Sequence, residues 1–68
     1  MTLEQIKDAV LQGNKVLWKS PSYEVIKDSK DQWLIACSNG HYIGLTWADG
    51  ITLNGNEQDF YKIINIKN

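Results

Sequence analysis

Hydrophobic residues near the start of the chain recur at helical spacing. They lie three or four positions apart on one side, at Leu3, Ile6, Ala9 and Val10. Thr2 and Gln5 have the spacing of a capping box, in which two side chains satisfy the free N–H groups of a first helical turn. Gly13-Asn14 is a typical helix stop. The pattern predicts a helix from Leu3 to Gln12.

After residue 14 the hydrophobic period changes to two, which is the period of a strand with one buried side. The predicted strands are 15–19, 23–27, 32–37, 41–47 and a short one at 51–53. The apolar tail from Phe60 to Ile66 predicts a last strand or a docked segment. Residues 1–68 therefore form a single small α+β domain, with an N-terminal helix packed on one face of a five- to six-stranded antiparallel β-meander.

Turn residues separate the predicted strands. Ser20-Pro21-Ser22 predicts the first turn, and the polar run 28–31 ends the second strand. Asn39-Gly40 is the strongest short hairpin signal. Asp49-Gly50 and Asn54-Gly55 are interpreted as turns and not as ligand loops, because glycine permits the positive φ that such turns need.

Hairpin register assigns each side chain to one face of the sheet. A two-residue loop at Asn39-Gly40 sets Ala36 opposite Ile43, and a loop at Ser29-Lys30 sets Val25 opposite Leu34. The face expected beneath the helix then holds Val16, Trp18, Tyr23, Val25, Leu34, Ala36, Ile43 and Leu45. The opposite face holds Leu17, Glu24, Ile26, Trp33, Ile35, Cys37, Tyr42, Gly44 and Thr46.

One helix cannot cover both faces, so the second face predicts a partner site. Its apolar patch consists of Trp33, Ile35, Tyr42 and Ile26, with Trp33 as the expected main contact. Three possibilities stay open at this point: the tail folds over the patch, a second chain covers it, or it binds something else.

Chain length makes a partner chain plausible. A chain of 68 residues forms one domain, and a domain of this size buries only about 60% of its unfolded surface. One cysteine excludes an internal disulfide, and one cysteine with one histidine is too few for a structural zinc site. We expect neither metal nor cofactor, and a homodimer is the commonest source of extra burial.

Charge argues against electrostatic capture of nucleic acid. The net charge is −1, and all seven basic residues are lysines. An alternative follows from three tryptophans interleaved with lysines, which could stack bases of a single strand on a small sheet. Single-stranded nucleic-acid binding is therefore the second functional hypothesis.

No set of residues predicts an enzyme. Cys37 and His41 fall on opposite faces in the register above, which argues against a thiol–imidazole pair. Glu57 and Asp59 are interpreted as a solvated edge or the first turn of a short helix. The polar start of the chain does not resemble a signal peptide, and no apolar run approaches the roughly 18 residues of a membrane span. We expect a cytoplasmic protein without membrane contact.

The segment YIGLTWADGITLNGNEQDF contains the pattern IGLT-x2-DG-x2-LNG-x3-DF. With the opening TLEQIKDAVLQGNKVLW, it resembles a family of small bacteriophage- and prophage-encoded proteins. The likeness covers roughly residues 2 to 61. It implies a bacterial host cell and an accessory gene product, and it supplies no functional residues. Taken with the apolar patch, it predicts an interaction module that binds itself or a host protein.

Overall fold

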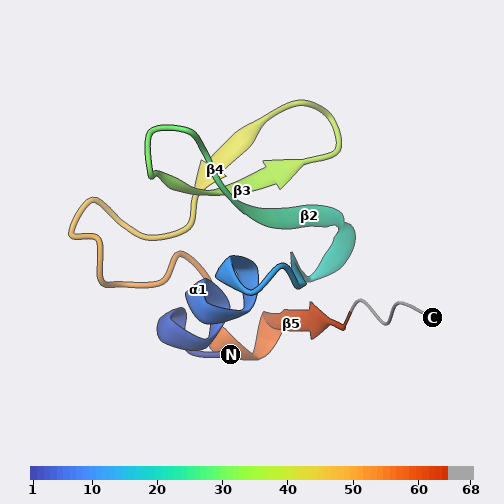
Figure 1. Cartoon of the computed structure of the whole chain (residues 1–68). Coiled ribbons are helices and arrows are strands. Elements are labelled where there is room, and N and C mark those ends of the chain that lie inside the picture. Colours follow the sequence, from blue (N-terminus) through green and yellow to red (C-terminus); the bar gives the residue numbers. More distant parts are fainter. Residues whose placement is uncertain (65–68) are drawn as a thin grey trace.

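The computed structural model describes residues 1–64 and begins with the predicted helix (Figure 1). Helix α1 spans Leu3–Leu11. The backbone N–H of Gln5 donates to Thr2 Oγ1 at 3.2 Å, and the N–H of Thr2 donates to Gln5 Oε1 at 2.9 Å. Gly13 takes a positive φ of 89° and ends the helix. The capping box and the stop signal are confirmed.

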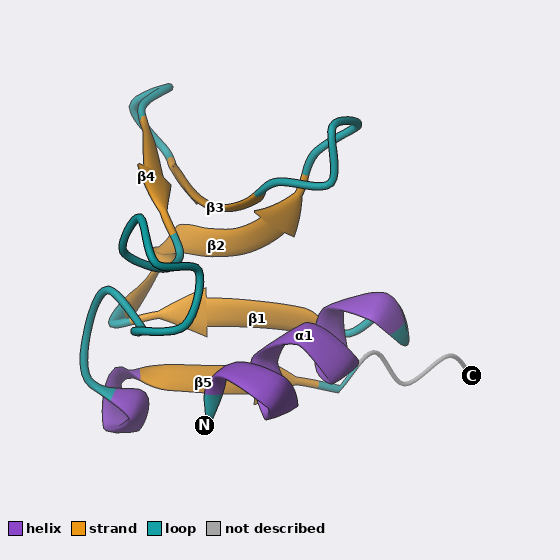
Figure 2. Cartoon of the chain, turned by 90° about the vertical axis from the view of Figure 1, so that its left-hand side faces the viewer, coloured by secondary structure: helices purple, strands orange, loops and turns teal. Residues whose placement is uncertain are grey.

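Five antiparallel strands follow in the described part of the chain. They are β1 (Lys15–Trp18), β2 (Ser20–Lys27), β3 (Trp33–Cys37), β4 (Tyr42–Gly44) and β5 (Phe60–Ile63). The sheet order is β4-β3-β2-β1-β5, so the last strand pairs with the first (Figure 2). A short 3-10 helix, η1 (Glu57–Asp59), precedes β5. The expected α+β fold, with a helix against an antiparallel sheet, is confirmed, and the sheet is open.

Several strand boundaries differ from the sequence prediction. Ser20–Ser22 is not a turn but the start of β2; the chain reverses at Lys19, which has a φ of 65°. The predicted strand at 51–53 contributes a single bridge, between Thr46 and Leu53. The tail forms a strand over Phe60–Ile63, and the predicted continuation to Ile66 lies outside the described residues.

Both central hairpins have three-residue loops where two-residue loops were predicted. In the β3–β4 hairpin the N–H of Cys37 donates to the carbonyl of His41 at 2.8 Å, and Gly40 has a φ of 91°. In the β2–β3 hairpin the N–H of Asp28 donates to the carbonyl of Gln32 at 2.9 Å, and Asp31 has a φ of 62°. A residue with positive φ at the third loop position is characteristic of three-residue hairpins.

The extra loop residue moves β3 to the opposite register. Val25 pairs with Ile35, where the prediction paired it with Leu34. Ile35 in turn pairs with Ile43. The β3–β4 hairpin is also shifted by one residue, and this second shift cancels the first. Ile43 therefore lies on the side of the sheet beneath the helix, as predicted. The face assignment is therefore wrong for β3 alone, because a one-residue slip inverts every side chain of a strand.

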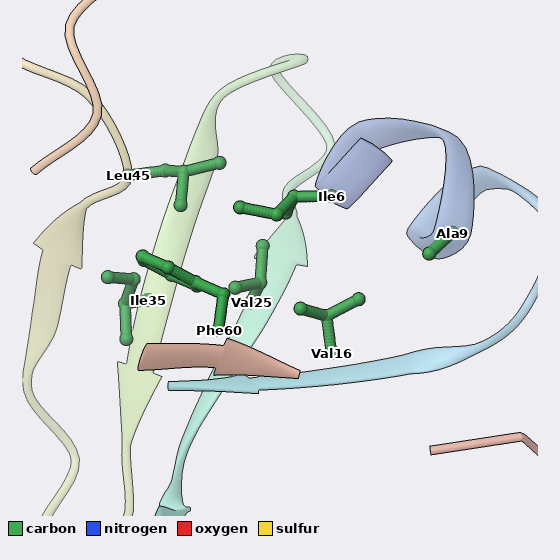
Figure 3. Packing of buried hydrophobic residues seen from close by; sticks show 7 residues of the cluster. All are labelled: Ile6, Ala9, Val16, Val25, Ile35, Leu45 and Phe60. Carbon is green, nitrogen blue, oxygen red and sulfur yellow. The ribbon is translucent and has the colours of Figure 1, made fainter. Parts of the chain in front are cut away.

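The core lies between α1 and one face of the sheet. Its buried side chains come from the helix, the strands and the segment after β4: Ile6, Ala9, Val16, Val25, Ile35, Leu45 and Phe60 (Figure 3). Trp18 extends this core, because its ring stacks on Phe60 at 6.0 Å between centroids and meets Tyr23 edge-on at 5.3 Å.

Candidate interaction surface

The opposite side of the sheet faces away from α1, and we call it the helix-free face. Strand alternation and the observed registers place ten residues on it: Lys15, Leu17, Glu24, Ile26, Leu34, Ala36, Tyr42, Gly44, Tyr61 and Ile63. Seven of these ten side chains are apolar or aromatic. This composition is unusual for a sheet face that meets only water.

One row of cross-strand neighbours runs across all five strands of the helix-free face. Tyr42 pairs with Ala36, Ala36 with Glu24, Glu24 with Leu17, and Leu17 with Tyr61. Directly opposed side chains on one face touch. The row therefore forms a continuous band from one edge of the sheet to the other.

Exposure is highest at the two ends of this band. Tyr42 is 64% exposed on β4 and Tyr61 is 39% exposed on β5, whereas Leu17 in the middle is 2% exposed. Leu17 is buried without belonging to the core beneath α1. Other parts of the chain therefore already shield the Leu17 side chain from water.

The predicted patch is divided between the two faces. Ile26 and Tyr42 lie on the helix-free face, as expected. Ile35 is instead fully buried in the core, and Trp33 packs against that core. The reason is the shifted register of β3, which turns its odd-numbered residues toward α1. A partner on the helix-free face cannot touch Ile35.

Two cations lie near the Trp33 ring on the core side of the sheet. Lys7 Nζ of α1 lies 5.6 Å from the centroid of the Trp33 ring, and Lys27 Nζ of β2 lies 5.9 Å from it. Trp33 therefore makes contacts within the chain on the side of the sheet that packs against α1, and it does not belong to the helix-free face.

The strand β5 does not fold over the helix-free face. It extends the sheet beside β1 and adds Tyr61 and Ile63 to the face, both more than a third exposed. Sequence reasoning missed these two residues because the register of the tail was undetermined. It also placed Leu34 and Ala36 under the helix, because the sequence did not distinguish hairpin loops of two residues from loops of three residues.

A second apolar site lies on the loop between β4 and η1. Trp47 is 63% exposed and Ile51 is 77% exposed. The carboxylate of Asp49 accepts hydrogen bonds from the N–H of Ile51 and the N–H of Thr52, both at 2.9 Å, and from Thr52 Oγ1 at 2.6 Å. The hydroxyl of Thr52, followed by the two amides, lowers the pKa of Asp49 below 3.8. The bonds confirm the predicted turn at Asp49-Gly50.

The arrangement of Cys37 and His41 differs from the prediction. Their backbones form a hydrogen-bonded pair, so both side chains point to the same side of the β3–β4 hairpin. No hydrogen bond joins the two side chains in the described structure. Glu57 and Asp59 lie in η1, which agrees with the expected short helical turn. Residues 1–64 contain no cluster of three potential metal ligands.

Lysines meet aromatic rings mainly within the chain. Lys19 Nζ lies 4.5 Å from the centroid of Trp18, whose ring is half-buried. On the helix-free face Lys15 is the single lysine among the described residues. This lysine shares the face with the two exposed tyrosines, Tyr42 and Tyr61. Single-stranded nucleic-acid binding stays a prediction.

Across residues 1–64, no helix has the length and hydropathy that a membrane span requires. Comparison with known proteins gives no match to a family model, a curated protein or a solved structure. The resemblance to phage-encoded proteins therefore stays a prediction, and functional reasoning depends on the surface described above.

Proposed function

We propose that this chain is a protein-interaction module that binds through its helix-free face. The observation that carries the proposal is the continuous band from Tyr42 through Leu17 to Tyr61. Apolar and aromatic side chains gathered on one side of a small protein usually mark a protein–protein contact. Tyrosine is also enriched at such contacts, because its ring is apolar and its hydroxyl stays hydrogen-bonded.

The two exposed tyrosines favour a protein partner over a small ligand. They lie at opposite edges of the sheet, on β4 and β5, with three strands between them. A partner that contacts both must span the sheet. A small ligand would instead need a concave pocket with a few convergent polar groups. The band is a broad surface, and it fits another folded chain.

The predicted setting is a bacterial cell, in which the chain acts as an accessory phage or prophage product. This setting rests on the sequence resemblance alone. It determines the medium for the test, because a bacterial lysate then contains the host proteins among which a partner would be found.

Sedimentation in buffer and in lysate tests the proposal. The full chain, with a fluorophore attached after Asn68, is sedimented in buffer at rising concentrations and in bacterial lysate. We expect a complex in at least one medium. The variant Tyr42→Ser/Tyr61→Ser should return the chain to the monomer position, because it removes both exposed ends of the band. Tyr42 is 64% exposed and Tyr61 is 39% exposed, and circular dichroism checks that the double variant keeps the fold.

Trp47→Ser is the matched control. Trp47 is as exposed as Tyr42 but lies on the loop outside the helix-free face. We expect Trp47→Ser to leave the complex intact. A chain that stays monomeric in both media would refute the proposal. So would a complex that survives loss of both tyrosines and dissociates on loss of Trp47, since the loop would then be the binding element.

A further inference from the structure

The helix-free face carries one charge of each sign. Glu24 lies half-buried within the central band, and Lys15 lies exposed on β1, two residues before Leu17 and on the same side. The ion pair found within the described structure, Lys27–Asp31, involves neither of them. Both charges of this face therefore lack an ionic partner within residues 1–64.

A charge on a contact surface must find a partner there. A carboxylate or ammonium that loses water without gaining an opposite charge costs several kcal/mol. A partner that covers the helix-free face is therefore favoured if it places a cation over Glu24 and an anion near Lys15. A second copy of the same chain presents both groups on its own helix-free face.

Two-fold symmetry brings these groups together. In a two-fold contact, if one residue of the first copy meets a second residue of its partner, the reciprocal pair forms as well. An axis that lies in the interface, midway between Glu24 and Lys15, places each Glu24 over the Lys15 of the other copy. One symmetry operation therefore forms two ion pairs from one carboxylate and one ammonium per chain.

We infer that the helix-free face binds a second copy of this chain, with Glu24 of each copy paired to Lys15 of the other. The inference rests on the proposed function and names its partner. The two sheets pack face to face, about 10 Å apart, as in two-layered β proteins. Leu34, Ile26 and the two tyrosines supply the apolar contact, and the two ion pairs select the orientation.

Charge reversal tests this arrangement. Purified full-length chain is analysed by sedimentation equilibrium as wild type, Glu24→Lys, Lys15→Glu and the double reversal. Each single reversal sets like charges against each other, which should raise the dissociation constant by about 10- to 100-fold. The double reversal restores opposite charges in both pairs. We expect it to return the dissociation constant to within about threefold of wild type.

Folding does not confound the result. Lys15 is exposed, so Lys15→Glu should leave the fold unchanged, and it provides the decisive single variant if Glu24→Lys proves unstable. Glu4→Lys, an exposed reversal on α1 outside the face, is the control with the same change in net charge as Glu24→Lys. We expect it to leave the dissociation constant unchanged.

Failure of this inference can be distinguished from failure of the proposed function. A purified chain that stays monomeric at all concentrations overturns the inference, as does a dimer that the reversals do not weaken or the double reversal does not restore. In each of these cases, a complex in lysate that depends on Tyr42 and Tyr61 still supports the interaction module. Its partner would then be a different protein.

Discussion

A one-methylene deletion at Ile35 tests which way β3 faces. Ile35 is fully buried between α1 and the sheet, whereas Ile26 on the neighbouring strand is half-buried on the helix-free face. Ile35→Val and Ile26→Val remove the same group from the same residue type. The two substitutions make the same chemical change. A difference between their effects on the free energy of unfolding therefore shows which isoleucine is more deeply buried.

The expected magnitudes follow from packing. Removing a methylene group from a tightly packed core costs about 0.5–1.5 kcal/mol, because the transfer free energy is lost and a small cavity remains. We expect about 1 kcal/mol for Ile35→Val. The side chain of Ile26 is already partly in water, and its shortening leaves no closed cavity. We therefore expect Ile26→Val to lower the free energy of unfolding by less than about 0.5 kcal/mol.

Urea unfolding, followed by tryptophan fluorescence, measures both values. It should be done at the lowest workable protein concentration, so that association through the helix-free face contributes little. A loss of 1 kcal/mol should also lower the melting temperature by about 4–8 °C in a domain of this size. If Ile26→Val costs as much as Ile35→Val or more, β3 does not face α1 with Ile35, and the face assignment is refuted.

Three further predictions concern single residues. Gly55→Ala should destabilise by at least about 1 kcal/mol, because Gly55 has a φ of 149° and an added Cβ would lie 2.8 Å from Nε1 of Trp18; thermal unfolding measures this. Thr2→Ala should cost about 1 kcal/mol by removing the helix cap, and an equal melting temperature would contradict it. Folding lowers the pKa of Asp49, so the hydrogen bonds to its carboxylate stabilise the fold fully at pH values above the pKa of Asp49 in the unfolded chain. This stabilisation is lost as the pH falls through the pKa of Asp49 in the folded chain. Thr52→Val should raise the pKa of Asp49 toward the ordinary value of an aspartate in an NMR titration, and an unchanged pKa would contradict the assigned cause.

Local patterns in the sequence were sufficient to predict the helix and the strands of the fold. The helix could be predicted because its cap, apolar stripe and stop agree within one stretch of twelve residues, from Thr2 to Gly13. Strand alternation could be predicted for the same reason, since each strand carries its own period. These signals depend on neighbours in sequence and not on what the strand packs against.

Register depended on loop length, which the sequence left ambiguous. Asn39-Gly40 is typical of a two-residue hairpin, yet Ser38 joins it and Gly40 takes the positive φ of a three-residue loop. Asp31 does the same in the preceding hairpin, although aspartate adopts this conformation less readily than glycine. One additional residue in each loop was enough to exchange Trp33 and Ile35 for Leu34 and Ala36 on the candidate surface.

The pairing of β5 with β1 depends on contacts that are distant in sequence. Lys15 pairs with Ile63, 48 positions later, and no local pattern specifies such a partner. The alternation of Phe60, Tyr61 and Lys62 does indicate that one of them faces the core. Which face Tyr61 takes is decided only by its pairing with Leu17.

The register of β2 and β3 is the central claim, because it determines which side chains the helix-free face presents. An NMR measurement of Hα–Hα contacts tests it directly. Val25 and Ile35 form a pair without mutual backbone hydrogen bonds, in which the Cα atoms of antiparallel strands approach to about 4.5 Å. We expect a strong Hα–Hα cross-peak between Val25 and Ile35. A strong cross-peak between Val25 and Leu34 in its place would put Ile35 on the open side of the sheet and contradict the account.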